Sequence, residues 1–352
     1  MGVMASTAEI TRNAEFLAHR YDATTQSFQF VALNREQHRH STFLTDEYIP
    51  GDSERIMVPA QDVVDDQAPV APIHFIFHSA FACSTMLARA LDIEGISMGL
   101  KEPIVLNDLV GMKRAGVAAG NLETALGQAV RLLARPFSKG ETVVVKPSNI
   151  VNGLAPLILD LRPDSKALLL HAPLKTYLQS LAAKNMWGRI WARETAIGIM
   201  QENGLVGGFA SADLLRLTDI QVAAVAWLSE QARFAKIVND YGSDRIRTLN
   251  SETFLANEQD TIASLATFFQ LDLSNGRIVE ILDGPAFTEH SKDFSTFDSN
   301  QRSDQHASTG NVHGEEIDMV VQWTAAVAQS QNIALELGSP LLSTEKQGRL
   351  PR

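Results

Sequence analysis

Short apolar runs alternate with helical patterns along most of the chain. Each run has the length and composition of a strand that is buried on both faces of a parallel sheet. The runs lie at residues 73–77, 96–100, 141–146, 166–172 and 246–250. Apolar residues recur at helical spacing over 86–92, 121–135, 153–161, 174–184, 220–240 and 257–269. This alternation predicts right-handed βαβ units, and therefore an α/β, three-layer fold in which helices flank a parallel sheet.

The two ends of the chain differ from this pattern. Residues 1–70 mix polar and aromatic residues and end in an acidic, proline-containing stretch, which indicates an N-terminal extension packed on a core domain of residues 71–352. The segment 295–314 is almost devoid of large apolar residues, and we expect a mobile loop there. Residues 315–337 resume a helical pattern, and the tail after Gly338 is expected to fray.

Composition narrows the class of protein. With 30 Lys plus Arg against 41 Asp plus Glu, the net charge is −11, which argues against a general nucleic-acid or membrane-surface binder. The single cysteine, Cys83, excludes an intrachain disulfide and a multi-cysteine zinc site. His38 and His40 lie in a polar strip that is typical of a solvated surface, so we expect no metal. No apolar run reaches membrane-spanning length, and a soluble, cytoplasmic protein is expected.

The loop after the first buried strand has the features of an anion-binding turn. Unpaired backbone N–H groups at the start of a helix attract anions, and the small residues Ala82 and Cys83 let the backbone approach a ligand. Ser84 and Thr85 add hydroxyl donors. The Walker lysine is absent, which counts against Mg-ATP. The alternative is a tight strand–helix turn that Ser84 caps.

Charged side chains stand at the ends of two further strands. The strand 141–146 ends in Lys146, and the strand 96–100 is followed by Lys101 and Glu102. Ligands of open parallel sheets bind beyond the carboxyl ends of the strands, where these residues and the loop meet. A lysine at one strand end is usually solvated, but the three strand ends together indicate a group-transfer site.

An ordered series of segments carries a family resemblance. The segments IFHSAFACSTMLARAL, LKEP, VVVKPSN, ALLLHAPLKTYL and IRTLNSETFLANEQDTIASLATFF resemble the P-loop sulfotransferases, and more closely a group of bacterial sulfotransferase-like proteins with the form HSAF-x-CST. The similarity covers about residues 70–290. It implies a P-loop-type fold and 3′-phosphoadenosine 5′-phosphosulfate (PAPS) as the sulfuryl donor.

The resemblance implies roles for the loop and the strand-end lysine. Ala82, Cys83, Ser84 and Thr85 correspond to the residues that hold the 5′-phosphosulfate of PAPS. Lys146 corresponds to the family's lysine that reaches the leaving phosphate.

A second set of positions concerns the 3′-phosphate. His171 lies where the family has an arginine that binds this phosphate, and Ser180 lies one residue after the family's second ligand. Arg189 and Arg193 are candidates to replace the missing charge.

Two further positions depart from the family pattern. Phe81 is the nearest counterpart of the usual basic residue in the loop. Ser148 stands where cytosolic members carry a catalytic histidine.

The implied reaction is in-line transfer of a sulfuryl group to a hydroxyl or amine of a small molecule or glycan, with no metal. Lys146 and the loop amides would stabilise charge on the leaving phosphate, and Glu102, or else His78, would take the acceptor proton. The structural alternatives are an ion pair or cap for Glu102 and turn hydrogen bonds for His78. The oligomeric state is left open.

Two other functions fit the same residues. One is a catalytically silent P-loop relative that binds a nucleotide or a protein partner, and the other is a nucleotide-dependent phosphoryl transferase. Compensating cations in the cleft (Lys101, Lys146, Arg189 and Arg193) would favour the enzyme. A cleft filled by Phe81 and lined by acids would favour the silent relative.

Overall fold

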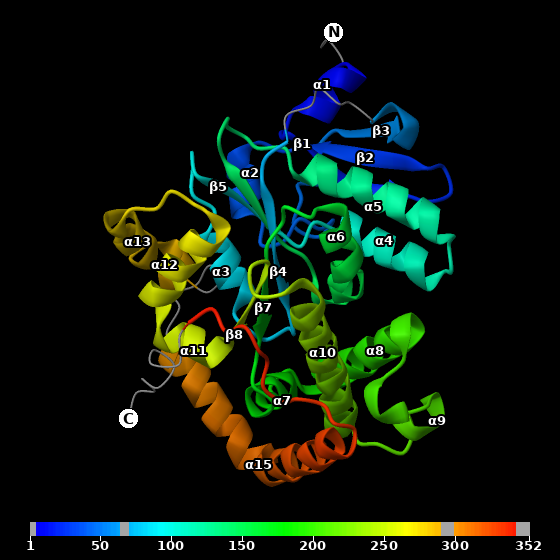
Figure 1. Ribbon diagram of the computed structural model, residues 1–352, viewed down its shortest axis with the longest axis vertical. Helices are drawn as coiled ribbons and strands as arrows, with labels where there is room; N and C mark the ends of the chain where they lie inside the picture. The colour runs from blue at the N-terminus through cyan, green and yellow to red at the C-terminus, as the bar shows by residue number, and fades with distance from the viewer. Residues whose placement is uncertain (1–4, 64–69, 290–298, 343–352) are drawn as a thin grey trace.

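A five-stranded parallel sheet forms the centre of the molecule (Figure 1). The computed structural model describes residues 5–63, 70–289 and 299–342. The strand order is β5-β6-β4-β7-β8. The strands are β4 (Ile73–His78), β5 (Ser97–Lys101), β6 (Thr142–Lys146), β7 (Ala167–His171) and β8 (Ile246–Asn250). Each predicted run forms one of these strands, and the predicted α/β fold with a parallel sheet flanked by helices is confirmed.

The sheet separates two apolar clusters because successive side chains of a strand point to opposite faces. Phe75 and Phe77 belong to one cluster, and Ile76 between them belongs to the other. The first face is covered by α4 (Val105–Arg114), α5 (Ala119–Leu133) and α6 (Ala155–Leu161). The second is covered by α3 (Ser84–Ala90), α7 (Leu174–Ala182) and α12 (Glu258–Phe269). The long helix α10 (Asp219–Tyr241) contributes to both clusters.

The other helices lie around this core. They are α1 (Thr7–Arg12), α2 (Arg35–His40), α8 (Asn185–Asn203), α9 (Ser211–Leu214), α11 (Ser251–Ala256), α13 (Asn275–Leu282), α14 (Pro285–Thr288) and α15 (Ser299–Ser330). None of the described helices is long and apolar enough to cross a membrane.

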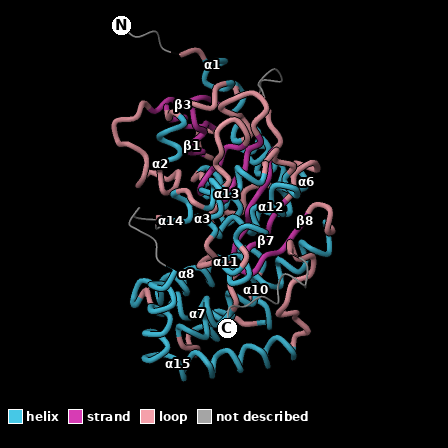
Figure 2. The backbone as a smooth tube through the Cα atoms, turned by 90° about the vertical axis from the view of Figure 1, so that its left-hand side faces the viewer, coloured by secondary structure: helices cyan, strands magenta, loops and turns pink. Residues whose placement is uncertain are grey.

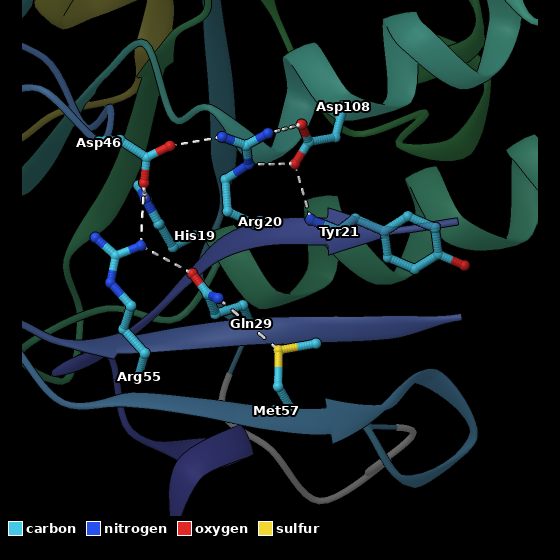
Figure 3. A network of polar contacts seen from close by, with 8 residues as sticks. All are labelled: His19, Arg20, Tyr21, Gln29, Asp46, Arg55, Met57 and Asp108. Carbon is cyan, nitrogen blue, oxygen red and sulfur yellow. Dashed lines mark hydrogen bonds and ion pairs between the residues drawn. The ribbon is translucent and has the colours of Figure 1, made fainter. Parts of the chain in front are cut away.

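The N-terminal residues build a second, antiparallel sheet of β1 (Phe16–Asp22), β2 (Ser27–Ala32) and β3 (Arg55–Pro59). Figures 1 and 2 place this sheet and α15 at opposite ends of the molecule. The β1–β3 sheet shares an apolar cluster with the parallel sheet. Arg20 also donates two hydrogen bonds to Asp108 of α4, at 2.8 and 2.9 Å (Figure 3). The N-terminal region is therefore joined to the core by both apolar packing and a bidentate ion pair.

Two expectations about the C-terminal region are wrong. Residues 299–314, expected in a mobile loop, belong to helix α15, and residues 295–298 lie outside the described residues. The later half of α15 packs on α7 and α10, and extending a helix that is already nucleated costs little. Residues 338–342 do not fray but pair with β8: Thr248 donates to Ser339 O at 2.9 Å, and Leu341 donates to Thr248 O at 2.8 Å. Residues 343–352 lie outside the described residues.

His38 is not on a solvated surface, as its polar strip suggested. Its side chain is 2% exposed, and neither ring nitrogen has a hydrogen-bond partner among the described residues. The ring packs edge-on against Phe137, with 5.1 Å between the ring centroids. Burial, together with the charges of Lys101, Arg135 and Arg35, lowers the pKa of His38 to about 3. The imidazole is therefore neutral in the folded protein.

We expect His38→Leu to reduce the acid sensitivity of the fold. The unfolded histidine takes up a proton below pH 6.5, whereas the folded one does so only near pH 3, so its contribution to stability is lost as the pH falls between these values. From pH 7 to pH 5 the wild type should lose about 2 kcal/mol more unfolding free energy than the variant. Urea unfolding at both pH values measures this, with the exposed His40→Leu as control. Equal losses in His38→Leu and the wild type would contradict the assignment.

Candidate active site

The loop between β4 and α3 has an unusual backbone. Ala80, Phe81 and Cys83 have φ angles of 66°, 51° and 60°, in the left-handed region that non-glycine residues rarely adopt. Ala82, between them, is buried, and Cys83 is the residue before α3. Left-handed turns of this kind direct successive N–H groups into a concavity that binds anions. Non-glycine residues in this strained backbone conformation are common at ligand-binding sites.

His78 and Ser79 hold the loop in this conformation. The Nδ1 atom of His78 accepts a hydrogen bond from the Ala80 N–H at 3.1 Å, so Nε2 carries the proton and donates it to Pro147 O at 3.1 Å. Ser79 Oγ accepts the N–H of Ala172 at 3.0 Å. Both ring nitrogens of His78 are thus engaged in hydrogen bonds that position the loop, as its structural alternative predicted.

Asn152 holds the start of the same loop in place through the carbonyl of His78. Its Nδ2 atom donates to His78 O at 2.9 Å and to Glu230 Oε2 at 2.6 Å. Arg233 donates to the other oxygen of Glu230 at 2.6 Å. Burial raises the pKa of Glu230, while Arg233 and Asn152 oppose that shift. The sequence carries no signal for this support, because Asn152 and Glu230 are 78 residues apart and belong to no motif.

Lys146 and Glu102 are brought together at the ends of adjacent strands. Lys146 ends β6, its side chain is 1% exposed, and it forms an ion pair with the carboxylate of Glu102, which is 19% exposed. The Glu102 N–H also donates to Lys146 O at 2.7 Å. Burial lowers the pKa of Lys146, and the Glu102 carboxylate opposes that shift. The pair presents a buried cation that can stabilise an anion and a partly exposed carboxylate that can accept a proton.

Lys101 lies in a different environment from Lys146, although the two are register partners in β5 and β6. Lys101 Nζ donates to Arg39 O at 2.7 Å, and burial lowers the pKa of Lys101 to about 8. It lines a cavity of about 610 Å³ together with Arg89 and Arg277. Acids also line this cavity and pair with its arginines: Asp92 with Arg39, Glu280 with Arg277 and Glu289 with Arg89.

His171 ends β7 and lines a second cavity, of about 410 Å³. Gln231 Nε2 donates to His171 Nδ1 at 3.4 Å, and burial lowers the pKa of His171 to about 4. The imidazole is therefore neutral near pH 7. Glu336 also lines this cavity, and no lysine or arginine is among its described lining residues. A phosphate next to His171 would find no positive charge in this lining.

Arg189 and Arg193, the candidates to supply a positive charge for the 3′-phosphate, both bind Asp219. Arg193 donates to Asp219 at 2.7 Å and to the carbonyls of Leu214 and Leu217 at 3.1 and 3.2 Å. Arg189 donates to the second oxygen of Asp219 at 3.3 Å. Both guanidinium groups therefore brace the start of α10 against α8. Ser180 is half-buried near the end of α7.

Phe81 anchors the loop to α7 and α8. Its ring packs edge-on against Tyr177 and Trp191, with centroid distances of 5.6 and 5.4 Å. Trp187 stacks on Trp191 at 6.1 Å and is 58% exposed. The Phe81 side chain thus contributes packing to the loop. Ser84 and Thr85 are buried in the first turn of α3.

Ala80→Gly should stabilise the protein if the left-handed loop is strained. Glycine adopts this backbone conformation without the Cβ clash, so we expect a gain of roughly 0.5–1 kcal/mol in unfolding free energy. Urea unfolding measures the change. Ala263→Gly, inside α12, is the control, and it should lose about 1 kcal/mol. A loss at Ala80 as large as that at Ala263 would show that the loop is unstrained.

Comparisons with known proteins give structural matches only. No family model matches the sequence, and no curated protein matches it. The structure is similar to the sulfotransferase domain from the Synechococcus PCC 7002 olefin synthase, with 12% identity and a TM-score of 0.38 over 68% of this chain and 85% of that one.

Two other similar structures have comparable scores. Sulfotransferase STF1 from Mycobacterium tuberculosis H37Rv is 14% identical, with a TM-score of 0.38 over 69% of this chain and 78% of that one. The sulfotransferase domain from the curacin biosynthetic pathway is 14% identical, with a TM-score of 0.39 over 79% and 95%. All three are sulfotransferases or sulfotransferase domains, the family that the sequence motifs resemble. Because identities and TM-scores are low, the likeness assigns no residue and no activity to this chain.

Proposed function

We propose that the protein is a sulfotransferase that moves a sulfuryl group from PAPS to a hydroxyl or amine acceptor. The observation that supports this most directly is the Lys146–Glu102 pair at the carboxyl ends of β6 and β5. The left-handed loop follows β4, the strand next to β6, so an anion held by the loop would lie close to the pair. The site thus offers anion-binding amides, a cation and a proton acceptor.

In the proposed step the acceptor oxygen or nitrogen forms a bond to sulfur. The bond between sulfur and the bridging phosphate oxygen breaks, and 3′-phosphoadenosine 5′-phosphate leaves. The acceptor proton passes to the carboxylate of Glu102. Lys146 and the loop N–H groups stabilise the negative charge that develops on the leaving phosphate.

The described residues suit the 5′-phosphosulfate of PAPS better than its 3′-phosphate. The loop and Lys146 suit the 5′-phosphosulfate. At the position that the resemblance assigns to the 3′-phosphate, His171 is neutral and Arg189 and Arg193 are bound to Asp219. We therefore expect the 5′ end of the nucleotide to contribute most of its binding free energy.

Calorimetric titration with 3′-phosphoadenosine 5′-phosphate tests the donor site. We expect Lys146→Ala to weaken binding roughly tenfold to a hundredfold, because a charge-assisted hydrogen bond contributes about 1.5–3 kcal/mol. Ser84→Ala should also weaken it. Mg-ATP should bind much more weakly than this nucleotide, because the loop lacks a Walker lysine.

Lys101→Ala is the matched control for this titration. It also removes a buried lysine at a strand end, but its amine donates to Arg39 O and not to Glu102, so nucleotide binding should be retained. Thermal unfolding of each variant monitors the fold. A folded wild-type protein that does not bind the nucleotide would refute the sulfotransferase proposal.

Glu102→Gln should separate catalysis from donor binding. The amide cannot take a proton, so the rate of sulfuryl transfer from PAPS to a panel of phenols, alcohols and amines should fall about a hundredfold or more. Affinity for 3′-phosphoadenosine 5′-phosphate should not fall, because the substitution removes a negative charge from beside Lys146. The exposed Glu94→Gln is the control. A variant that retains the wild-type rate would remove Glu102 from the mechanism.

The neutral His171 favours a second candidate, a catalytically silent relative that binds a nucleotide. Of the four cations expected in the cleft, only Lys146 lies beside Glu102, whereas Lys101, Arg189 and Arg193 bind elsewhere. If this candidate is right, the protein binds the nucleotide but transfers no sulfuryl group to any phenol, alcohol or amine of the panel.

A further inference from the structure

The cavity of about 610 Å³ beside β5 has a lining of its own, separate from the loop and from the Lys146–Glu102 pair. Its described lining comes from α2, α3, the end of β5, α13 and α14, and from residues that directly follow α3 and α14. Helices α3, α13 and α14 lie close together in Figure 2. Cavities of this volume are typical of sites that bind small molecules.

Lys101 is the one lysine or arginine of this described lining that has no carboxylate partner among the described residues. It is 2% exposed, and its Nζ atom donates to a backbone carbonyl, Arg39 O, at 2.7 Å. The arginines of the lining pair with acids instead: Arg39 with Asp92 at 3.3 Å, Arg89 with Glu289 at 2.9 Å and Arg277 with Glu280 at 2.5 Å. The Lys101 ammonium is thus removed from water without a counter-charge in contact with it, which is unfavourable.

Lys101 is nevertheless charged at neutral pH. Burial, together with the charges of Arg89 and Arg39, lowers the pKa of Lys101 to about 8, and the charge of Asp92 opposes this shift. The hydrogen bond to Arg39 O uses one of the three ammonium hydrogens. An anion in the cavity would therefore find both a positive charge and hydrogen-bond donors at Lys101.

The rest of the lining indicates which kind of anion fits. Because each arginine is already paired with an acid, Lys101 offers a single uncompensated positive charge. Glu94 in the same lining is exposed and negative, so a second negative charge on the ligand would be repelled. Apolar surface comes from Ala90, Ile93, Ile281, Pro285 and Ala286. This combination suits one carboxylate on an aliphatic stem.

We infer that this cavity binds a small aliphatic monocarboxylate, whose carboxylate accepts hydrogen bonds from Lys101 Nζ and whose stem packs on Ile281 and Pro285. The bound anion supplies the counter-charge that Lys101 lacks. This site is additional to the proposed sulfuryl-transfer site and does not depend on the proposed function, because the two share no described residue.

Hexanoate, a monocarboxylate with an aliphatic stem, is the probe for this site. Its dissociation constant is measured by saturation-transfer NMR at pH 7, and we expect about 1 mM or less for the wild type. Acetate, which lacks the stem, and 1-hexanol, which lacks the charge, should each bind at least about tenfold more weakly. Hexanoate that does not bind, or 1-hexanol that binds as tightly, would overturn the inference.

Lys101→Met removes the ammonium and keeps most of the side-chain length. It should weaken hexanoate binding about tenfold or more, because a charge-assisted hydrogen bond is lost. Lys113→Met is the matched control: Lys113 Nζ also donates to a backbone carbonyl, Gly153 O, at 2.7 Å, but Lys113 lies outside this lining. Thermal unfolding monitors the fold of both variants. Unchanged binding in Lys101→Met, or an equal loss in Lys113→Met, would contradict the assignment.

Chemical acetylation of the wild type provides a second measurement that requires no substitution. The rates at which N-acetoxysuccinimide modifies Lys101 and Lys113 are followed by peptide mass spectrometry. Hexanoate at ten times its dissociation constant should slow the modification of Lys101 about tenfold, because it occupies most of the sites. Lys113 should react at its original rate. Absence of protection at Lys101, or equal protection of both lysines, would refute the site.

Competition experiments keep this inference and the proposed function apart. Hexanoate should remain bound when 3′-phosphoadenosine 5′-phosphate is added in excess. Displacement by this nucleotide, or tighter binding of inorganic phosphate than of hexanoate, would overturn the monocarboxylate assignment. Hexanoate binding that depends on Lys101, in a protein that binds no nucleotide, would support this site and refute the sulfotransferase proposal.

Discussion

The ion pair between Lys146 and Glu102 is the interaction on which the arrangement of the site depends. An ammonium that is removed from water destabilises the fold by several kcal/mol unless a counter-charge meets it. Glu102 provides that charge from a left-handed backbone position, with φ of 52°, immediately after β5. The same conformation lets its N–H bind Lys146 O and brings the chain back against Leu44. Backbone hydrogen bonds beside this neutralised charge thus connect the end of β5, the residues just before α4 and Leu44.

The loop after β4 is prepared in a different way, through hydrogen bonds and packing. His78, Ser79 and Asn152 hold its backbone from the sheet side, and Phe81 holds it from the side of α7 and α8. Under the proposed function, a loop that is braced on both sides would need little reorganisation to bind an anion. Hydrogen bonds from the sheet side and aromatic packing from α7 and α8 therefore fix the same short loop.

The sequence predicted the parallel sheet well because strands buried on both faces appear as continuous apolar runs, as in β4 and β6. It also placed Lys146 and Glu102 at strand ends that share one cleft, since parallel strands end at one edge, but it did not predict that β5 and β6 are neighbours. The sequence did not predict the burial or the contacts of side chains whose partners are distant along the chain. Nothing local shows that His38 is buried, that Arg193 binds Asp219, or that Phe43 contacts Lys146. The polar residues after Ser299 join a helix because the later turns of α15 pack on α7, which composition alone does not reveal.

The pairing of residues 338–342 with β8 bears on how the chain is made. A strand at the rim of a sheet offers unpaired amides to any other extended chain. The residues that cover β8 follow it by about 90 positions. At synthesis rates of about 5–20 residues per second, they emerge from the ribosome on the order of 5–20 seconds later. During that interval a nascent chain carries an open β-edge, so crowded polysomes and a scarcity of chaperones are the conditions under which it would aggregate.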